Sequence, residues 1–245
     1  MQFSNFFLAL AAIPMAMGYS YCPTKSLPAA KGYKALKATQ YITKGSVYDA
    51  KYFKIDRGVA CTAQSEGALT NMLYFCFPTG EKDAVFVLEA GATLRNVIIG
   101  AKQREGVYCI GPCTLENVWF EDVCEDAISI KGNGLATISG GGAFKAADKV
   151  IQHNGCGHVN VVDFYAEDYG KVYRSCGNCV KNCARTVHMS GVTALNGGEL
   201  MGINPNLGDK ATYENNCSDA KTECQAYKGC DKSKGACESP KAGKC

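Results

Sequence analysis

Apolar and polar residues alternate in a repeating pattern through the middle of the chain, between Glu105 and Cys179. Four short segments align within this stretch, and the period-two alternation of each is typical of a β-strand. These segments are Gly106–Gly111, Asp126–Lys131, Lys149–Asn154 and Lys171–Cys176. Their first residues lie 20, 23 and 22 positions apart. Repeats of this length indicate a chain that winds into a solenoid.

The alternation also predicts which side chains of these strands face the core. One parity is expected to point inward, and it comprises Tyr108, Ile128, Ile151 and Tyr173. The other parity is expected to point mostly outward, and it comprises Cys109, Ser129, Gln152 and Arg174. His153 has the inward parity, so we expect a core histidine and not a catalyst.

A second set of strands precedes the first in each repeat. Its members are Ala92–Ile99, Cys113–Phe120, Leu135–Gly140 and His158–Phe164, and Thr186–Val192 continues the series. Two strands per turn of about 22 residues, with Gly and Asn at the corners, predict an all-β fold, a right-handed parallel β-helix. Side chains one coil apart would then stack at ~4.8 Å. An antiparallel β-sandwich is the alternative, since it also has short, regularly spaced strands.

The two ends of the chain have different compositions. Residues 1–18 are apolar and uncharged, with small residues before position 19, and they are interpreted as a signal peptide of a secreted protein. A buried N-terminal helix is the alternative. No later apolar run is long enough to span a bilayer, so no membrane partner is expected. The net charge of +3 argues against a dedicated nucleic-acid binder.

Fifteen cysteines in a secreted chain imply a disulfide framework, whose connectivity the sequence leaves open. Cys176 and Cys179 have the spacing of a metal site, but no second pair stands at zinc-site spacing, so a disulfide role is favoured. The predicted β-helix domain covers residues 19–216. The Cys-rich tail, residues 217–245, is expected to form a disulfide-stapled cap, with a carbohydrate-binding module as the alternative.

Charged residues gather at the starts of the aligned strands. Three carboxylates stack in the first coils, at Glu105, Glu125 and Asp126. Carboxylates this close repel one another unless a cation lies among them, and oxygen-only ligands in a secreted protein favour Ca²⁺. The sequence therefore predicts a calcium site formed by these three side chains.

A row of cations follows in the next coils. It comprises Lys131, Lys149, Lys171 and Arg174. Mutual proximity of like charges is expected to lower the pKa of a lysine in this row. Arginine suits the recognition of carboxylates, so a chain of uronic acids is the substrate class that the row favours. A salt-bridged outer face of the solenoid, without function, is the alternative.

Several of these stretches resemble family 3 of the polysaccharide lyases, the compact pectate lyases of plant-associated microbes. The resembling segments are Asp83–Gly100, Glu105–Cys109, Cys113–Ala127, Asp148–Cys156, Tyr169–Cys179 and Met201–Thr212. The resemblance implies a monomeric parallel β-helix that binds Ca²⁺ and cleaves (1→4)-α-D-galacturonan, the polygalacturonate of pectin, by β-elimination. The expected products are 4,5-unsaturated oligogalacturonates.

The resemblance also implies roles for individual residues. Glu105, Glu125 and Asp126 match the family's acidic calcium positions. Lys149, Lys171 and Arg174 match its cations of the catalytic cleft, and Lys131, Lys171 and Arg174 are expected to bind substrate. Lys149 or Arg174 would be the base, and the lower ordinary pKa of lysine favours Lys149.

Besides the Cys-rich tail, the chain departs from the family pattern in two places. Tyr108 stands where many members carry His, and its predicted place in a strand core implies little effect on the chemistry. Residues 68–79 have no counterpart and contain Cys76, whose removal would leave fourteen cysteines to pair evenly. A translated unspliced intron and an added surface loop both explain this insertion. A hydrolase and a non-catalytic pectin-binding or host-interaction protein on the same fold are the rival functions.

Overall fold

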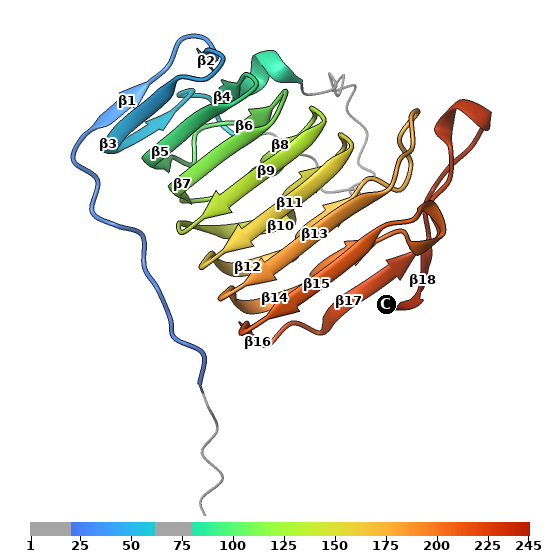
Figure 1. Cartoon of the computed structure of the whole chain (residues 1–245). Coiled ribbons are helices and arrows are strands. Elements are labelled where there is room, and N and C mark those ends of the chain that lie inside the picture. Colours follow the sequence, from blue (N-terminus) through green and yellow to red (C-terminus); the bar gives the residue numbers. More distant parts are fainter. Residues whose placement is uncertain (1–20, 62–79) are drawn as a thin grey trace, which may run out of the picture.

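The computed structural model describes residues 21–61 and 80–245. Eighteen strands belong to one sheet that winds around itself, so the described chain forms the predicted right-handed parallel β-helix (Figure 1). No helix among the described residues has the length and apolar content needed to cross a membrane. The predicted signal peptide and the insertion at residues 68–79 lie outside the described residues.

Each full coil contributes to three ladders of parallel strands. Ladder A contains β2 (Gln40–Ile42), β4 (Ala84–Leu88), β6 (Glu105–Cys109), β8 (Asp126–Ile130), the ends of β10 (Gly142–His153), β12 (Tyr165–Ser175) and β14 (Thr193–Ile203), and β17 (Thr222–Tyr227). Ladder B contains the starts of β3 (Val47–Asp56), β5 (Ala92–Ile99) and β7 (Cys113–Phe120), then β9 (Gly134–Ser139), β11 (Gly157–Val162), β13 (Arg185–Ser190) and β15 (Lys210–Glu214). Ladder C contains β1 (Tyr33–Ala35), the remaining halves of the long strands and β16 (Cys217–Ser218).

Each coil contributes two strands, as predicted, but the coils form three ladders because several long strands bend and serve two of them. β5 bends at Asn96 and β7 at Asn117, which have φ of 53° and 52°. Asparagine tolerates this left-handed conformation better than most residues. The third ladder therefore follows the second without a break in the apolar pattern, and period-two alternation alone does not reveal it.

The core of ladder A is a stack of large side chains from successive coils. Val107, Ile128, Ile151 and Tyr173 occupy equivalent register positions and have no exposed surface. The inward direction predicted for Ile128, Ile151 and Tyr173 is confirmed. His153 is also fully buried, and its Nδ1 lies 2.8 Å from the hydroxyl of Tyr173, so the predicted core histidine is confirmed.

The predicted alignment of the first segment was wrong by one residue. Val107, and not Tyr108, pairs with Ile128, and Tyr108 pairs with Ser129. A slip of one residue exchanges the two faces of a strand. Tyr108 therefore points away from the main core and packs in a small separate cluster with Ala84 and Val87, where only 4% of it is exposed, and Cys109, predicted to point outward, is fully buried.

Seven disulfides use all fourteen of the described cysteines. The pairs are Cys22–Cys217, Cys61–Cys124, Cys109–Cys113, Cys156–Cys183, Cys176–Cys179, Cys224–Cys245 and Cys230–Cys237. The disulfide predicted at Cys176 is confirmed. Cys76 lies outside the described residues.

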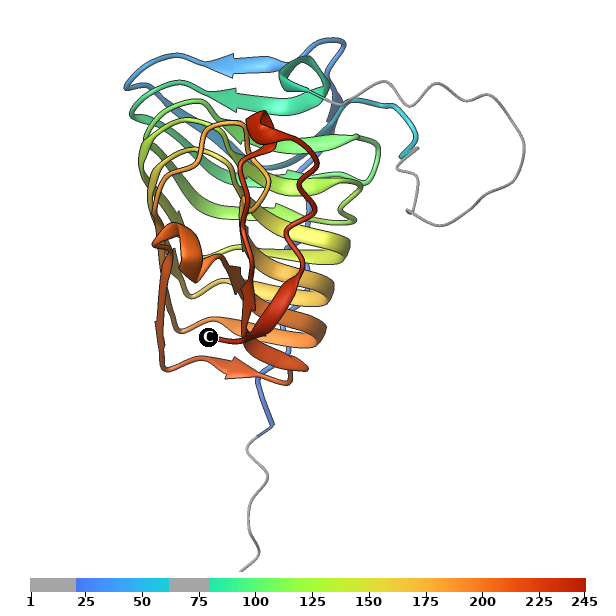
Figure 2. The same ribbon diagram turned by 90° about the vertical axis from the view of Figure 1, so that its right-hand side faces the viewer.

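The C-terminal residues extend ladder A and then turn back. β17 pairs with β14, and β18 (Lys241–Lys244) pairs antiparallel with β17. In Figure 2 the tail, drawn in red, runs along one side of the stacked coils. Three single-turn 3-10 helices, η1 (Glu81–Asp83), η2 (Pro205–Leu207) and η3 (Lys232–Lys234), complete the described elements.

Candidate active site

A row of charged side chains crosses ladder A at one register position. Lys149 of β10 pairs with Asp126 of β8 on one side and with Lys171 of β12 on the other. The same register places Glu105 one coil before Asp126 and Glu199 one coil after Lys171. Because parallel strands repeat at nearly constant spacing, charges far apart in the sequence become direct neighbours.

Close ion pairs connect the middle of this row. The Lys149 ammonium lies 3.4 Å from Asp126 Oδ1 and also contacts the carboxylate of Asp148. Lys171 Nζ lies 3.0 Å from the other oxygen of Asp148. Asp148 therefore bridges the two lysines. Sequence reasoning noted its position beside Lys149 but gave it no role in the site.

The protonation equilibria of the row differ from the sequence-based expectation. Burial alone would lower the pKa of Lys149, but the charges of Asp126 and Asp148 outweigh it and raise that pKa. The predicted lowering was therefore wrong for Lys149, because carboxylates and not cations are its nearest neighbours. Burial also acts to raise the pKa of Asp148, yet the charges of Lys149 and Lys171 lower it.

At the opposite end of the row, the pKa of Asp126 shifts the other way. Burial, with the nearby charge of Asp148, raises the pKa of Asp126 although Lys149 opposes the change. Glu105 is also buried, and Glu125 is half-buried just before β8. No group of three or more His, Cys, Asp or Glu side chains in the described ranges converges as a ready-made metal site.

A second outward row lies three residues further along each strand. Tyr108, Ser129, Gln152 and Arg174 occupy equivalent positions in successive coils. The ammonium of Lys131 lies 4.8 Å from the centre of the Tyr108 ring, a cation–π contact. The expectation that Tyr108 lies in the core, away from the chemistry, was wrong. Its ring lies on the face that carries the charged row.

Arg174 is the most enclosed cation of the site. Only 8% of it is exposed, and its guanidinium donates to Asn204 Oδ1 at 3.1 Å and to Ser239 Oγ at 3.0 Å. The guanidinium carbon lies 3.7 Å from the centre of the Tyr227 ring. Burial lowers the pKa of Arg174 from its ordinary value, although the neighbouring Tyr227 and Glu199 oppose the change.

A hollow of about 180 Å³ brings the predicted cleft cations together. Lys149, Lys171 and Arg174 line it with Asp148 and Gln152. Glu238 and Ser239 of the tail also line it. They were not predictable from the sequence, because the tail has no repeat that would fix its register.

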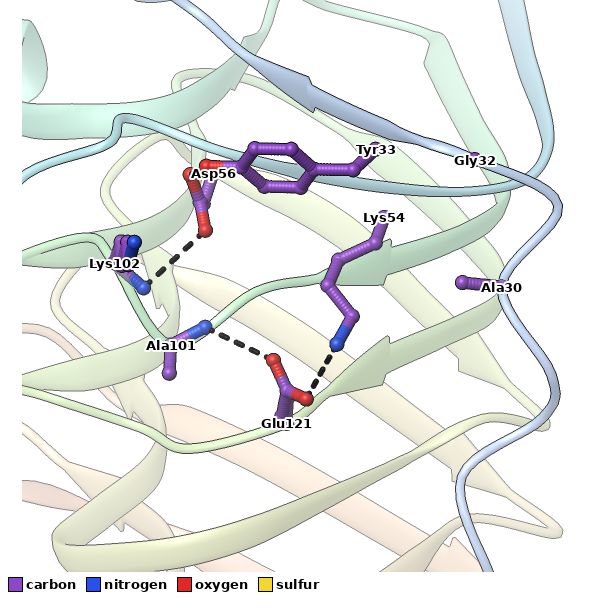
Figure 3. A pocket seen from close by; sticks show the side chains of 8 residues that line it. All are labelled: Ala30, Gly32, Tyr33, Lys54, Asp56, Ala101, Lys102 and Glu121. Carbon is purple, nitrogen blue, oxygen red and sulfur yellow. Dashed lines mark hydrogen bonds and ion pairs between the residues drawn. The ribbon is translucent and has the colours of Figure 1, made fainter.

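A larger hollow, of about 500 Å³, lies beside ladder C and away from these cations (Figure 3). Its polar groups satisfy one another: Lys54 Nζ lies 2.5 Å from Glu121, and the Tyr33 hydroxyl donates to Asp56 at 2.9 Å. Backbone amides of Ala101 and Lys102 donate to the same two carboxylates. The carboxylates of this larger hollow are paired within the protein, whereas the smaller hollow gathers the three predicted cleft cations, so the smaller hollow is the candidate active site.

Comparisons with known proteins identify the family of the chain. The pectate lyase family model matches residues 24–234. A probable pectate lyase F of Aspergillus terreus is 57% identical over 208 residues, which cover 83% of this chain and 82% of the relative. A probable pectate lyase F of Aspergillus flavus is 52% identical over 251 residues and covers 100% of this chain and 99% of the relative.

The similar solved structures are also pectate lyases. Pectate lyase Pel3 of Pectobacterium carotovorum has a TM-score of 0.65 and 29% identity, covering 89% of this chain and 68% of its own. Pectate lyase PelI of Erwinia chrysanthemi, in complex with tetragalacturonic acid, has a TM-score of 0.62 and 30% identity, covering 83% of this chain and 64% of its own. The family model matches most of the chain, and the relatives are similar to it over nearly their full length. This chain is therefore an enzyme of the pectate lyase family.

Proposed function

We propose that this enzyme is secreted, requires Ca²⁺ and cleaves the (1→4)-α-D-galacturonan of pectin by β-elimination. The observation that carries the proposal is the order of charges along ladder A, from Glu105 and Asp126 to Lys149 and Lys171, with Arg174 beside them. A polyanionic chain with a metal-binding carboxylate on each sugar suits a cleft that is acidic at one end and cationic at the other. Seven disulfides suit an oxidising, extracellular compartment.

The acidic end suits calcium by its donor chemistry. Glu105, Glu125 and Asp126 offer only hard oxygen ligands, and burial raises the pKa of Asp126, which a nearby divalent cation would reverse. We propose that these three carboxylates hold Ca²⁺. Bound there, the ion supplies positive charge next to the uronate carboxylate, which stabilises negative charge on the sugar during the reaction.

Lys149 is the proposed base. It lies between the acidic and cationic ends, and the ordinary pKa of lysine is about two units below that of arginine. The carboxylates of Asp126 and Asp148 raise its pKa, so neutralising them would release a proton from the ammonium. Arg174, whose guanidinium donates to Asn204 and Ser239, is better suited to hold a carboxylate than to accept a proton.

The bond changes of the proposed reaction balance within the sugar chain. Neutral Lys149 takes the proton from C5 next to the carboxylate, and the C5–H electron pair forms the C4–C5 double bond. The bond between C4 and the glycosidic oxygen breaks, and the leaving oxygen takes a proton from solvent. Lys131, Lys171 and Arg174 are proposed to bind uronate carboxylates and to stabilise the negative charge that develops as C5 loses its proton.

Ultraviolet absorbance of the unsaturated uronate, measured on polygalacturonate with and without a calcium chelator, tests this function. We expect an absorbance increase that stops when the chelator is added and returns with excess Ca²⁺. New reducing ends without that absorbance would mean hydrolysis, which requires a pair of carboxylates instead. An absorbance increase that the chelator does not change would contradict the calcium requirement but not the β-elimination.

A further inference from the structure

The C-terminal tail reaches the candidate active site from the far end of ladder A. β17 continues the ladder beside β14, and β18 returns along β17. The disulfide Cys224–Cys245 joins β17 to the C-terminal residue, and Cys230–Cys237 closes a loop in the connection between β17 and β18. The backbone amide of Cys230 donates to the carbonyl of Gly177 at 2.7 Å, which fastens the tail to the rim of the hollow. The tail is therefore a built part of the cleft wall.

Tyr227 of the tail covers the guanidinium of Arg174. The ring centre lies 3.7 Å from the guanidinium carbon, which leaves no room for water between them. Gly202 lies at the register position beside Arg174, and an added Cβ there would come within 2.9 Å of both Arg174 Cδ and Tyr227 Cε2. Glycine at this position therefore allows the stacking of Arg174 and Tyr227.

The hydroxyl of the same tyrosine binds a buried carboxylate. It lies 2.9 Å and 2.7 Å from the two oxygens of Glu199, and Lys241 Nζ lies 2.7 Å from the first of them. Glu199 is only 5% exposed and follows Lys171 in the charged row. A buried carboxylate deprived of such partners would attract the nearest cation. Apart from Lys241, its cationic neighbours are Lys171, beside it in the charged row, and Arg174, both proposed to bind uronates.

We infer that Tyr227 is a positioning residue for Arg174: its ring holds the guanidinium in place, and its hydroxyl, with Lys241, keeps Glu199 from competing with the substrate's carboxylates. The inference rests on the proposed role of Arg174 in binding uronate. It assigns to the tail, whose sequence does not continue the repeat, a part in recognising pectin. The two functions of Tyr227 separate chemically, because phenylalanine retains the ring and loses only the hydroxyl.

Steady-state kinetics of three variants on polygalacturonate test the inference. Tyr227→Leu removes both functions and is expected to raise KM about tenfold with a smaller change in kcat. Tyr227→Phe is expected to raise KM about threefold, because Glu199 then lacks one of its partners. Adding Glu199→Gln to Tyr227→Phe removes the competing charge and is expected to return KM close to the wild-type value. The same change added to Tyr227→Leu is expected to give no such recovery.

Tyr213→Phe is the matched control, since the Tyr213 hydroxyl binds Glu223 at 2.9 Å on an exposed surface away from the cleft. We expect it to leave KM and kcat unchanged. Wild-type KM in both Tyr227 variants, or a Tyr227→Phe defect that Glu199→Gln does not relieve, would overturn the inference.

The calorimetric Kd of trigalacturonate, measured in the presence of Ca²⁺, separates this inference from the proposed reaction. Wild-type protein that binds trigalacturonate but forms no unsaturated product would overturn the reaction alone. Binding that does not depend on Tyr227 would overturn the inference alone. The melting temperature of Tyr227→Phe is expected to fall by only a few degrees and to stay well above the assay temperature, which excludes a general loss of folding as the cause.

Discussion

The two ends of the candidate cleft differ in how their charges are satisfied. At the cationic end, Arg174 and Glu199 are both buried, and each has protein partners supplied by the tail. At the acidic end, burial raises the pKa of Asp126 although Lys149 lies 3.4 Å away. One end is therefore complete within the protein, whereas the other has an excess of carboxylate charge.

This difference explains why one site would combine side-chain cations with a metal ion. Fixed cations, held by a disulfide-bonded tail, suit the recognition of carboxylates that every pectate chain presents. A group of carboxylates that includes buried Asp126 suits a divalent cation, which adds positive charge that no side chain could concentrate as strongly. Lys149 lies where the two ends meet.

Replacing Lys149 is expected to have the largest effect. Lys149→Met should lower kcat about a thousandfold, because no neutral amine is left to take the C5 proton. The trigalacturonate Kd should change less than about tenfold, since Lys171 and Arg174 are retained. Lys145→Met is the control, because Lys145 is exposed and lies 3.9 Å from Asp122. If kcat of Lys149→Met stayed above about a tenth of the wild-type value, the base would be Arg174, and Arg174→Lys would then shift the pH dependence of kcat.

Removing one carboxylate from the acidic end is expected to have the second-largest effect. Asp126→Asn should lower kcat/KM about a hundredfold at limiting Ca²⁺, and excess Ca²⁺ should restore part of it, because one ligand is lost. The melting temperature without calcium should not fall by more than a few degrees, because ionised Asp126 is unfavourable where it is buried. Calcium titration by calorimetry checks the affinity. Asp122→Asn, in a half-exposed ion pair, should change neither kcat/KM nor the affinity for calcium.

The interior beneath the cleft predicts a pH dependence of stability. Burial, with the charge of Arg185, lowers the pKa of His153 from 6.5 to about 4. The unfolded chain therefore takes up this proton first, so stability is full above pH 6.5 and declines as pH falls toward 4. The expected loss between pH 7 and pH 5 is about 2 kcal/mol. Denaturant unfolding at the two pH values measures it.

A matched pair of variants assigns that pH dependence to the buried histidine. His153→Gln should show a smaller decline in the free energy of unfolding between pH 7 and pH 5, whatever its stability at pH 7. His188→Gln replaces a histidine whose side chain is 34% exposed and should retain the full decline. Equal declines in wild type and His153→Gln would assign the effect to other groups.

The smallest effect is expected at the rim of the acidic end. Lys131→Met should raise KM about threefold, because the exposed ammonium over the Tyr108 ring contributes one solvent-screened contact to the uronate chain. The effect should shrink as salt is added, which a KM series at rising ionic strength would reveal. Lys102→Met, beside the other hollow, should leave KM unchanged at every salt concentration.

The interior stack at Ile128, Ile151 and Tyr173 and the neighbouring charges at Asp126, Lys149 and Lys171 were predictable from the sequence. In a parallel β-helix, residues one repeat apart are spatial neighbours, so a regular sequence spacing fixes the contacts. The prediction failed at Tyr108, because the alignment used a spacing of 20 residues at this coil whereas the structure has 21, from Tyr108 to Ser129. One residue of register exchanges inside for outside, and the local pattern of Gly106–Gly111 fits both alignments.

The sequence by itself determined the solenoid, the parity of most core strands and the order of charges along one face, because all three follow from a repeat. Only the tertiary structure decided the disulfide pairs and the path of the tail that brings Tyr227 and Ser239 onto Arg174. The tail has no repeat, so no spacing in the sequence predicts its neighbours. Its position depends on disulfides and on packing against coils already formed, and those contacts exist only once the chain has folded.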